Sequence, residues 1–243
     1  MKSMKIIMSI LTAATLLSGC QLSTEREVDI ATLDSEKIVN TSRGMYDYSV
    51  AFSDVASLSE ESSQIVYGEV INVDYVTRRN GLCSTITEVQ VLKSMKGDFQ
   101  EGDIIKISAQ QGIMSVQEYI DSMDPEFREA AREEYQQYSD EELNDIYIQQ
   151  LAAGDIMLET GQKNVYFLCE SSYYDTENTY CRIAGPENQF VEVSEGVFMN
   201  TKTVGTRLSG NYRLNTMRTS LLQTESESSY TYSLDELIAQ MDL

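Results

Sequence analysis

The dipeptide Asn80-Gly81 lies between two runs of β-branched and aromatic residues, and it constrains the fold of this 243-residue chain more than any other feature. Asn-Gly is the strongest short-range signal for a β-hairpin, because both residues accept the positive φ angles that a type I′ turn requires. The runs at 65–78 and 82–93 therefore predict two antiparallel strands. The apolar face of the first run changes parity around Gly68, which indicates a bulge or sharp bend there.

Further strand signals follow this hairpin in two groups. Short runs rich in Val, Ile, Tyr and Phe are separated by turn residues such as Gly, Asn and Asp, which is the pattern of half-buried strands. The first group is a single run, and the second group has four runs. The segment between the two groups lacks this pattern. The predicted strands lie at 103–109, 163–169, 178–184, 189–193 and 196–200.

The intervening segment, residues 115–155, has helical spacing. Ser115 and Ser139 each begin a Ser-x-x-Glu capping box, and Asp124-Pro125 supplies an N-cap followed by proline at the first helical position. Three helix starts within about forty residues predict a helical insert. A further capping box at Ser233 predicts a short C-terminal helix.

Three strands, a helical insert and two strands with a hairpin extension predict a mainly β protein of the α+β class. This order is typical of a small barrel of the OB type, with the helices between strands 3 and 4. A different small barrel, or an α+β domain with a helical insertion, is the alternative. We expect a barrel domain over 51–200 with the insert at 115–155, followed by a polar extension and C-terminal helix over 201–243.

The first nineteen residues have the three parts of an export signal. Lys2 and Lys5 precede an apolar run at 6–17, which ends on Leu17-Ser18-Gly19-Cys20. Twelve helical residues span about 18 Å, less than the roughly 30 Å of a bilayer core, so this run is too short to remain as a membrane span. The stretch resembles the lipobox of bacterial lipoproteins, a family in which the cysteine is acylated and becomes the first residue of the mature chain.

This resemblance implies a signal peptide at 1–19, a lipid anchor at Cys20 and an extracytoplasmic location. Two or three acyl chains hold a protein on a membrane more firmly than a single chain. An ordinary secretory signal with a chance cysteine is the alternative. The polar, weakly periodic stretch at 20–50 predicts a tether between the anchor and the domain.

Composition excludes several classes of function. The chain has 18 basic and 39 acidic side chains, a formal net charge of −21, which argues against nucleic-acid binding because such binding needs Lys and Arg to displace counterions. Histidine is absent, which removes Ser-His and Cys-His nucleophilic sites and His-ligated zinc. We expect no cofactor, and a basic envelope protein or cations as partners.

A family resemblance extends over residues 53–200. The pattern consists of a "vGxV" strand, a "VLKxxKGD…GDxI" hairpin, a "YLxFL" strand and a final "G…F" strand. It is similar to a group of uncharacterised surface lipoproteins of low-GC Gram-positive bacteria, and it implies a lipid-anchored protein with an OB-like barrel and no catalytic residue. The chain departs from the pattern at Glu187-Asn188 and in its long acidic insert. The matching stretches are 62–73, 87–107, 164–169 and 180–193.

Three cysteines remain once Cys20 is set aside as the anchor. Cys169 and Cys181 lie on two predicted neighbouring strands, and a turn near Asp175 would bring them face to face. We therefore expect a disulfide between them, with Cys83 as a competing thiol or all three thiols reduced as the alternatives.

The loop between those strands carries several oxygen ligands. Glu170, Asp175 and Glu177 form a candidate calcium loop, because carboxylates at close spacing suit Ca²⁺. The regular D-x-D-x-D-G pattern is missing, so a solvated hairpin loop is the stronger interpretation. No other metal site is expected.

These observations favour a non-enzymatic protein that binds or supports another component of the cell envelope. The insert at 115–155 holds twelve acidic residues and two arginines, and its outer face is the expected contact surface, unless it serves only as a structural and solubilising coat. The rival hypothesis is a carboxylate-dependent hydrolase of the glycosidase type. That enzyme would need a deep cleft with two inward carboxylates about 5–10 Å apart.

Overall fold

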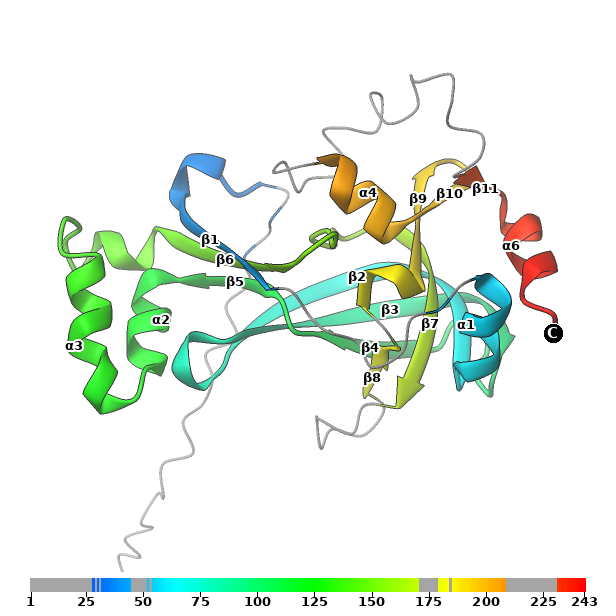
Figure 1. The fold of residues 1–243 in the computed structure, drawn as a ribbon, viewed down its shortest axis with the longest axis horizontal. Coiled ribbons are helices and arrows are strands. Elements are labelled where there is room, and N and C mark those ends of the chain that lie inside the picture. The colour runs from blue at the N-terminus through cyan, green and yellow to red at the C-terminus, as the bar shows by residue number, and fades with distance from the viewer. Residues whose placement is uncertain are drawn as a thin grey trace, which may run out of the picture.

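The computed structural model describes residues 28, 30, 32–44, 52, 54–170, 179–183, 185–208 and 231–243. The expected signal peptide at 1–19 and Cys20 lie outside these residues. Figure 1 shows a long β-hairpin that joins two parts of the molecule, a barrel at one end and a group of helices at the other.

The hairpin predicted from Asn80-Gly81 is present. Strands β2 (Gln64–Thr77) and β3 (Cys83–Lys96) pair in antiparallel fashion along almost their whole length. The short 3-10 turn η2 (Arg79–Gly81) joins them, and the φ angles of Asn80 and Gly81 are 58° and 71°. Both residues thus adopt the left-handed conformation for which the sequence selects them.

The predicted bulge near Gly68 is also present, since the β2–β3 register shifts between Tyr67 and Gly68. A Cβ atom at Gly68 would lie 2.4 Å from Cγ1 of Val89, so only glycine allows this close approach. Every second residue of β3 points inward, and the buried residues of this face are Cys83, Thr85, Thr87, Val89 and Val91.

Three more strands close a barrel: β4 (Ile104–Ala109), β7 (Lys163–Glu170) and β8 (Thr179–Arg182). The strand order is β7-β2-β3-β4-β8, and β8 also pairs with β7, so the five strands form a closed ring. The β4–β8 pair is parallel, whereas the other four pairs are antiparallel. This confirms a mainly β protein built on a barrel. The apolar interior contains Val66, Val70, Val89, Val91, Ile105, Ile107, Tyr166 and Leu168.

The edge of β7 opposite β2 is shared by two strands. Residues 164–166 pair with β9, and residues 168–170 pair with β8. The sheet then continues beyond the barrel as a hairpin extension, as the sequence predicted. Its strands are β9 (Gln189–Ser194), β10 (Val197–Asn200) and β11 (Thr231–Tyr232).

A separate three-stranded sheet has the order β1-β6-β5, and β1 runs parallel to β6. Its strands are β1 (Ile38–Gly44), β5 (Gly112–Ser115) and β6 (Tyr147–Ala152). The expected tether over 20–50 is therefore wrong for residues 38–44. An edge strand needs few apolar side chains, and Ile38 and Val39 suffice to pack β1 on the core, so its polar sequence concealed it.

The helical insert is confirmed in its first half and wrong in its second. Helices α2 (Val116–Ser122) and α3 (Pro125–Glu134) begin at the predicted positions, and the capping box of Ser115 with Glu118 is formed. The third helix is only a 3-10 turn, η3 (Glu142–Asn144), after which the chain enters β6. Strand β6 is the middle strand of its sheet and is buried on both faces, so its apolar run could be mistaken for a helix.

Three further helices pack around the barrel: α1 (Val55–Glu61), α4 (Thr201–Leu208) and α6 (Leu234–Gln240). The predicted C-terminal helix is confirmed as α6, and its capping box at Ser233 is formed. The beginning of the expected polar extension is instead the helix α4, whose residues Val204 and Leu208 are buried. Two 3-10 turns, η1 (Ser35–Lys37) and η4 (Gly185–Asn188), complete the described elements. Among the described helices, none is long and apolar enough to cross a membrane.

Candidate functional site

The helical lobe, defined here as residues 115–146, is fixed to the tip of the β2–β3 hairpin. The Gly81 amide donates a hydrogen bond to Oγ of Ser122 at 2.9 Å. The side chain of Asn80 both donates to Asp124 Oδ2 at 3.2 Å and accepts from the Asp124 amide at 3.0 Å. The turn predicted from the sequence thus also serves as the attachment point of the lobe.

A core of its own holds the lobe against the small sheet. Leu143 is fully buried, and Ala131 and Tyr135 are 5% and 4% exposed. The Tyr135 ring meets Tyr119 edge-on at 6.2 Å, and its hydroxyl accepts a hydrogen bond from Nδ2 of Asn40 on β1. The lobe is therefore packed on both the hairpin and the second sheet, which gives its outer surface a fixed shape.

Two arginines in the lobe form internal bonds. Nη2 of Arg128 donates to the backbone carbonyls of Asp121 and Met123, which satisfies the end of α2. Arg132 donates to the carbonyls of Tyr135 and Tyr138. It also pairs with Asp140.

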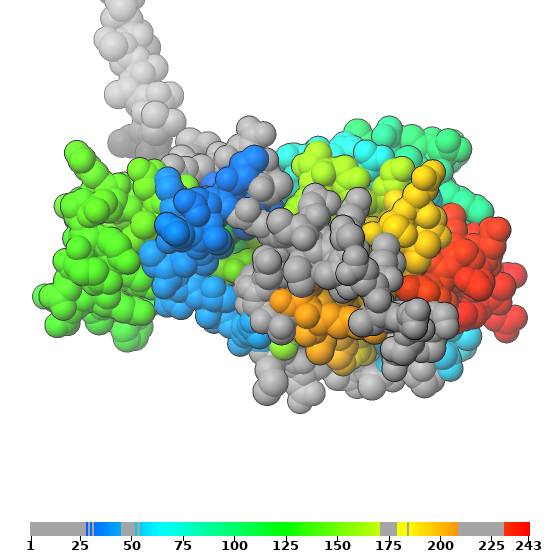
Figure 2. All heavy atoms as spheres, turned by 90° about the horizontal axis from the view of Figure 1, so that it is seen from above, coloured from blue at the N-terminus to red at the C-terminus, as the bar shows by residue number. Residues whose placement is uncertain are grey.

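The outer surface of α3 is acidic and carries one exposed aromatic ring. Phe127 is 53% exposed, because only Ala131 and the C-cap Tyr135 reach the core from this helix. Figure 2 shows the lobe at one end of the molecule, at the opposite end from α6. The exposed acids of this helix are Glu126, Glu129, Glu133 and Glu134.

A hollow of about 820 Å³ lies along α3, on the side of the helix that carries Arg128 and Arg132. Its lining combines apolar residues with two carboxylates and two guanidinium groups, so its charges are balanced. The lining residues are Ile120, Pro125, Arg128, Glu129, Arg132, Glu133 and Gln136.

A buried polar network was not predicted from the sequence. The guanidinium of Arg182 binds both carboxylate oxygens of Asp155, one of them at 3.0 Å, and the two side chains are 8% and 1% exposed. Nη1 of Arg182 also donates to Gln189, whose amide donates to Asn164 at 3.0 Å. The network ends at the hydroxyl of Tyr166, where burial raises the pKa above its usual range.

This network bears on the hydrolase hypothesis. Asp155 and Glu159 are the acidic residues buried within the described part of the chain. The Asp155 carboxylate is held in a bidentate ion pair with Arg182. Glycoside hydrolysis requires carboxylates that are unpaired and face a cleft, so Asp155 does not fit that role. Its position instead ties the loop before β7 to strand β8.

The cysteines expected to pair lie directly opposite each other. Cys169 on β7 is the register partner of Cys181 on β8, and their Sγ atoms are 3.3 Å apart as free thiols. Cys83 lies elsewhere, 3% exposed against the second sheet, and burial raises its pKa to about 12.

The candidate calcium loop falls mostly outside the described residues. Glu170 is exposed at the end of β7, whereas Asp175 and Glu177 lie outside the structure's description, as does Cys20, the expected lipidation residue. Within the described ranges, no group of three His, Cys, Asp or Glu side chains comes close enough to hold a metal ion.

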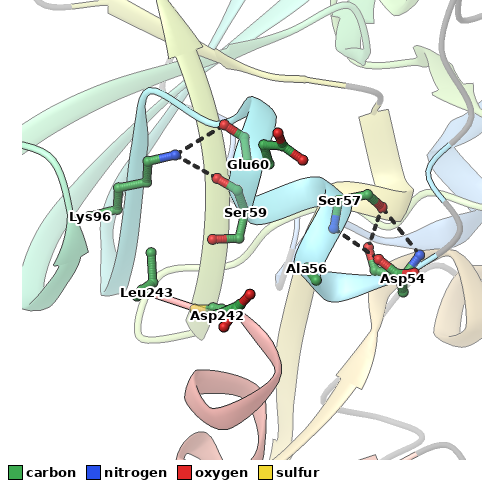
Figure 3. A pocket seen from close by; sticks show the side chains of 9 residues that line it. Asp54, Ala56, Ser57, Ser59, Glu60, Lys96, Asp242 and Leu243 are labelled. Atoms are coloured by element: carbon green, nitrogen blue, oxygen red, sulfur yellow. Dashed lines mark hydrogen bonds between the residues drawn. The ribbon is translucent and has the colours of Figure 1, made fainter.

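A pocket of about 660 Å³ separates α1 from the end of α6. Figure 3 shows Lys96 directed at the last turn of α1, where Nζ donates to the carbonyls of Ser59 and Glu60 at 2.6 and 3.1 Å. Asp54 is the N-cap of the same helix and accepts from the Ser57 amide. The charged groups of this pocket thus stabilise α1, and the acidic lobe remains the better candidate for recognition.

Comparisons with protein-family models, curated proteins and solved structures find no match for this chain.

Proposed function

We propose that this chain is a lipid-anchored, extracytoplasmic protein of a bacterial envelope that binds a basic partner through its helical lobe. The observation that carries the proposal is the outer surface of α3, where Phe127 is exposed on a helix that also carries four exposed glutamates, while both arginines bond internally. Aromatic rings anchor protein interfaces, and a field of one sign attracts a partner of the opposite sign.

The barrel supports this assignment as a scaffold. Its closed ring of five strands, with a parallel β4–β8 pair and the helices inserted between its third and fourth strands, is the basis on which we propose an OB-like fold. Nucleic acid is not proposed as its ligand. Lys96 caps α1, Lys106 pairs with Glu88, and Arg182 is buried, so these barrel cations are engaged within the protein.

A hydrolase gains no specific support, because Asp155 is already bound to Arg182 and the acids of α3 are exposed to solvent. We therefore propose a binding function without catalysis. The resemblance to Gram-positive surface lipoproteins is consistent with this assignment but names no ligand.

Anchoring at Cys20 can be tested separately. In cells fed an alkyne fatty acid, we expect the wild-type chain to be labelled and Cys20→Ala to lose the label, because acylation of a lipobox cysteine attaches the chains through its sulfur. Cys83→Ala is the matched control and should keep the label. Equal labelling of the wild type and Cys20→Ala would contradict the anchor.

Recognition by the lobe can be tested by site-specific cross-linking in intact cells. A photoreactive residue in place of Phe127 is expected to give a discrete adduct with a partner protein. The adduct should disappear when the exposed α3 glutamates Glu126, Glu129 and Glu133 are changed to Gln, because the attraction is electrostatic.

Ile104 provides the control position, since it is 58% exposed but lies on the barrel. A photoreactive residue there should not give the same adduct. Replacement of the whole 115–155 segment by a linker would be uninformative, because it would remove β6 and break the second sheet. Absence of an adduct at position 127, or an identical adduct at 104, would contradict recognition by the lobe.

A further inference from the structure

Cys169 and Cys181 meet the geometric conditions for reversible disulfide formation. Directly opposed residues of antiparallel strands have Cα atoms roughly 4.5–5.5 Å apart, within the range that a disulfide spans. The present Sγ–Sγ distance is 3.3 Å, and a disulfide bond requires about 2.05 Å. A small change of side-chain torsion angles is therefore enough to close the bond.

The position of the pair in the barrel gives the bond a mechanical role. Cys181 is the register partner of Cys169 on one side and of Ser108 on β4 on the other. Strand β8 is only four residues long, yet it closes the ring of five strands. Oxidation would join β7 and β8 covalently at the closure point.

The surroundings of the pair distinguish it from Cys83. Both Cys169 and Cys181 are partly exposed, whereas Cys83 is buried. A hydrogen bond from the Cys169 thiol and then the charge of Arg182 lower the pKa of Cys181 to about 7. The same hydrogen bond, with burial, raises the pKa of Cys169. Cys181 is thus the thiolate of the pair, and Cys169 holds the proton.

We propose that Cys169 and Cys181 form a redox-active dithiol whose substrate is a low-molecular-weight disulfide, and that its oxidation locks the barrel. This inference does not depend on the proposed recognition function, because it rests on β7 and β8 rather than on the lobe.

The exchange proceeds in two balanced steps. The Cys181 thiolate attacks one sulfur of the disulfide RSSR, which forms a mixed disulfide on Cys181 and releases RS⁻, and that anion takes a proton from water. Cys169 then gives its proton to water and attacks Sγ of Cys181, which forms the Cys169–Cys181 bond and releases the second RS⁻, and that anion is protonated by water in turn. Two electrons pass from the dithiol to RSSR, which is reduced to two thiols.

Oxidised glutathione serves as the probe for this exchange. The full chain, first reduced, is incubated with it, quenched in acid and examined by peptide mass spectrometry. We expect a Cys169–Cys181 bond, Cys83 as a free thiol, and two reduced glutathione molecules released per chain. Cys169→Ala should stop at the first step, with glutathione retained on Cys181. Cys83→Ala, the matched control, should behave like the wild type.

Alkylation by iodoacetamide supplies a second readout. In the native, reduced protein at pH 7.5, Cys181 should react at least about 100-fold faster than Cys83, because only Cys181 is substantially ionised. Its rate should rise with pH through about 7, and in Cys169→Ala this midpoint should move to higher pH. Similar rates for Cys181 and Cys83, or a bond that includes Cys83, would overturn the proposal.

Discussion

Replacement of Arg182 by Met is expected to lower the free energy of unfolding by about 3–5 kcal/mol, because it leaves the Asp155 carboxylate buried without its cation. Gln189 also loses the hydrogen bond that it accepts from Arg182, so the network that reaches Asn164 and Tyr166 is weakened. Urea unfolding followed by circular dichroism measures the effect. A loss of this size is a large part of the stability of a typical domain.

Two further variants identify the cause of this loss. The double variant Arg182→Met with Asp155→Leu should recover much of the stability, since replacing both partners of a buried ion pair by apolar groups is often neutral. Arg79→Met is the matched control, because it removes the ion pair with Asp124 at the surface, where Arg79 is 78% exposed, and its unfolding midpoint should stay close to that of the wild type. If the double variant is as unstable as Arg182→Met, the buried charge is not the cause.

Local chemistry explains which parts of the fold could be predicted. Asn80-Gly81 determines its turn because both residues accept positive φ angles. Capping boxes mark helix starts because their hydrogen bonds join residues only three positions apart, such as Ser115 and Glu118. Strands β1 and β6 depend instead on each other. Tyr147 to Ala152 has the apolar content of a helix or a buried strand, and only its pairing with β1 and β5 decides between them.

The same difference between local signals and distant contacts applies to the candidate sites. The opposition of Cys169 and Cys181 could be predicted, because both residues belong to strands that the sequence marks clearly. The Asp155–Arg182 pair could not, since the two residues are 27 positions apart and Asp155 looks like one more acid of the insert. The one sequence signal for this ion pair was the position of Arg182 on a short predicted strand, next to Cys181. The exposure of Phe127 was hidden because its spacing from Ala131 and Tyr135 fits a buried stripe.

Replacement of Gly81 by Ala is expected to destabilise the protein by about 2–4 kcal/mol and to loosen the lobe from the hairpin tip. A Cβ atom at this position would lie 2.4 Å from Cε2 of Tyr119, and that ring is held in place by Tyr135. Its φ of 71° adds backbone strain for any residue with a side chain. Hydrogen exchange measured by mass spectrometry should show faster exchange in α2 and α3, with β7 unchanged, because β7 pairs with the opposite end of β2.

Gly196→Ala separates the two causes of this effect. Gly196 has a φ of 70°, almost the same as that of Gly81, but a Cβ atom there meets nothing within 4 Å. This control should therefore show backbone strain of about 1–2 kcal/mol and leave exchange in α2 and α3 unchanged. The difference between the two variants measures the contact between the hairpin tip and Tyr119. If both variants lose the same stability and α2 stays protected in each, the turn does not hold the lobe, and the attachment must depend on the small sheet and on Leu143.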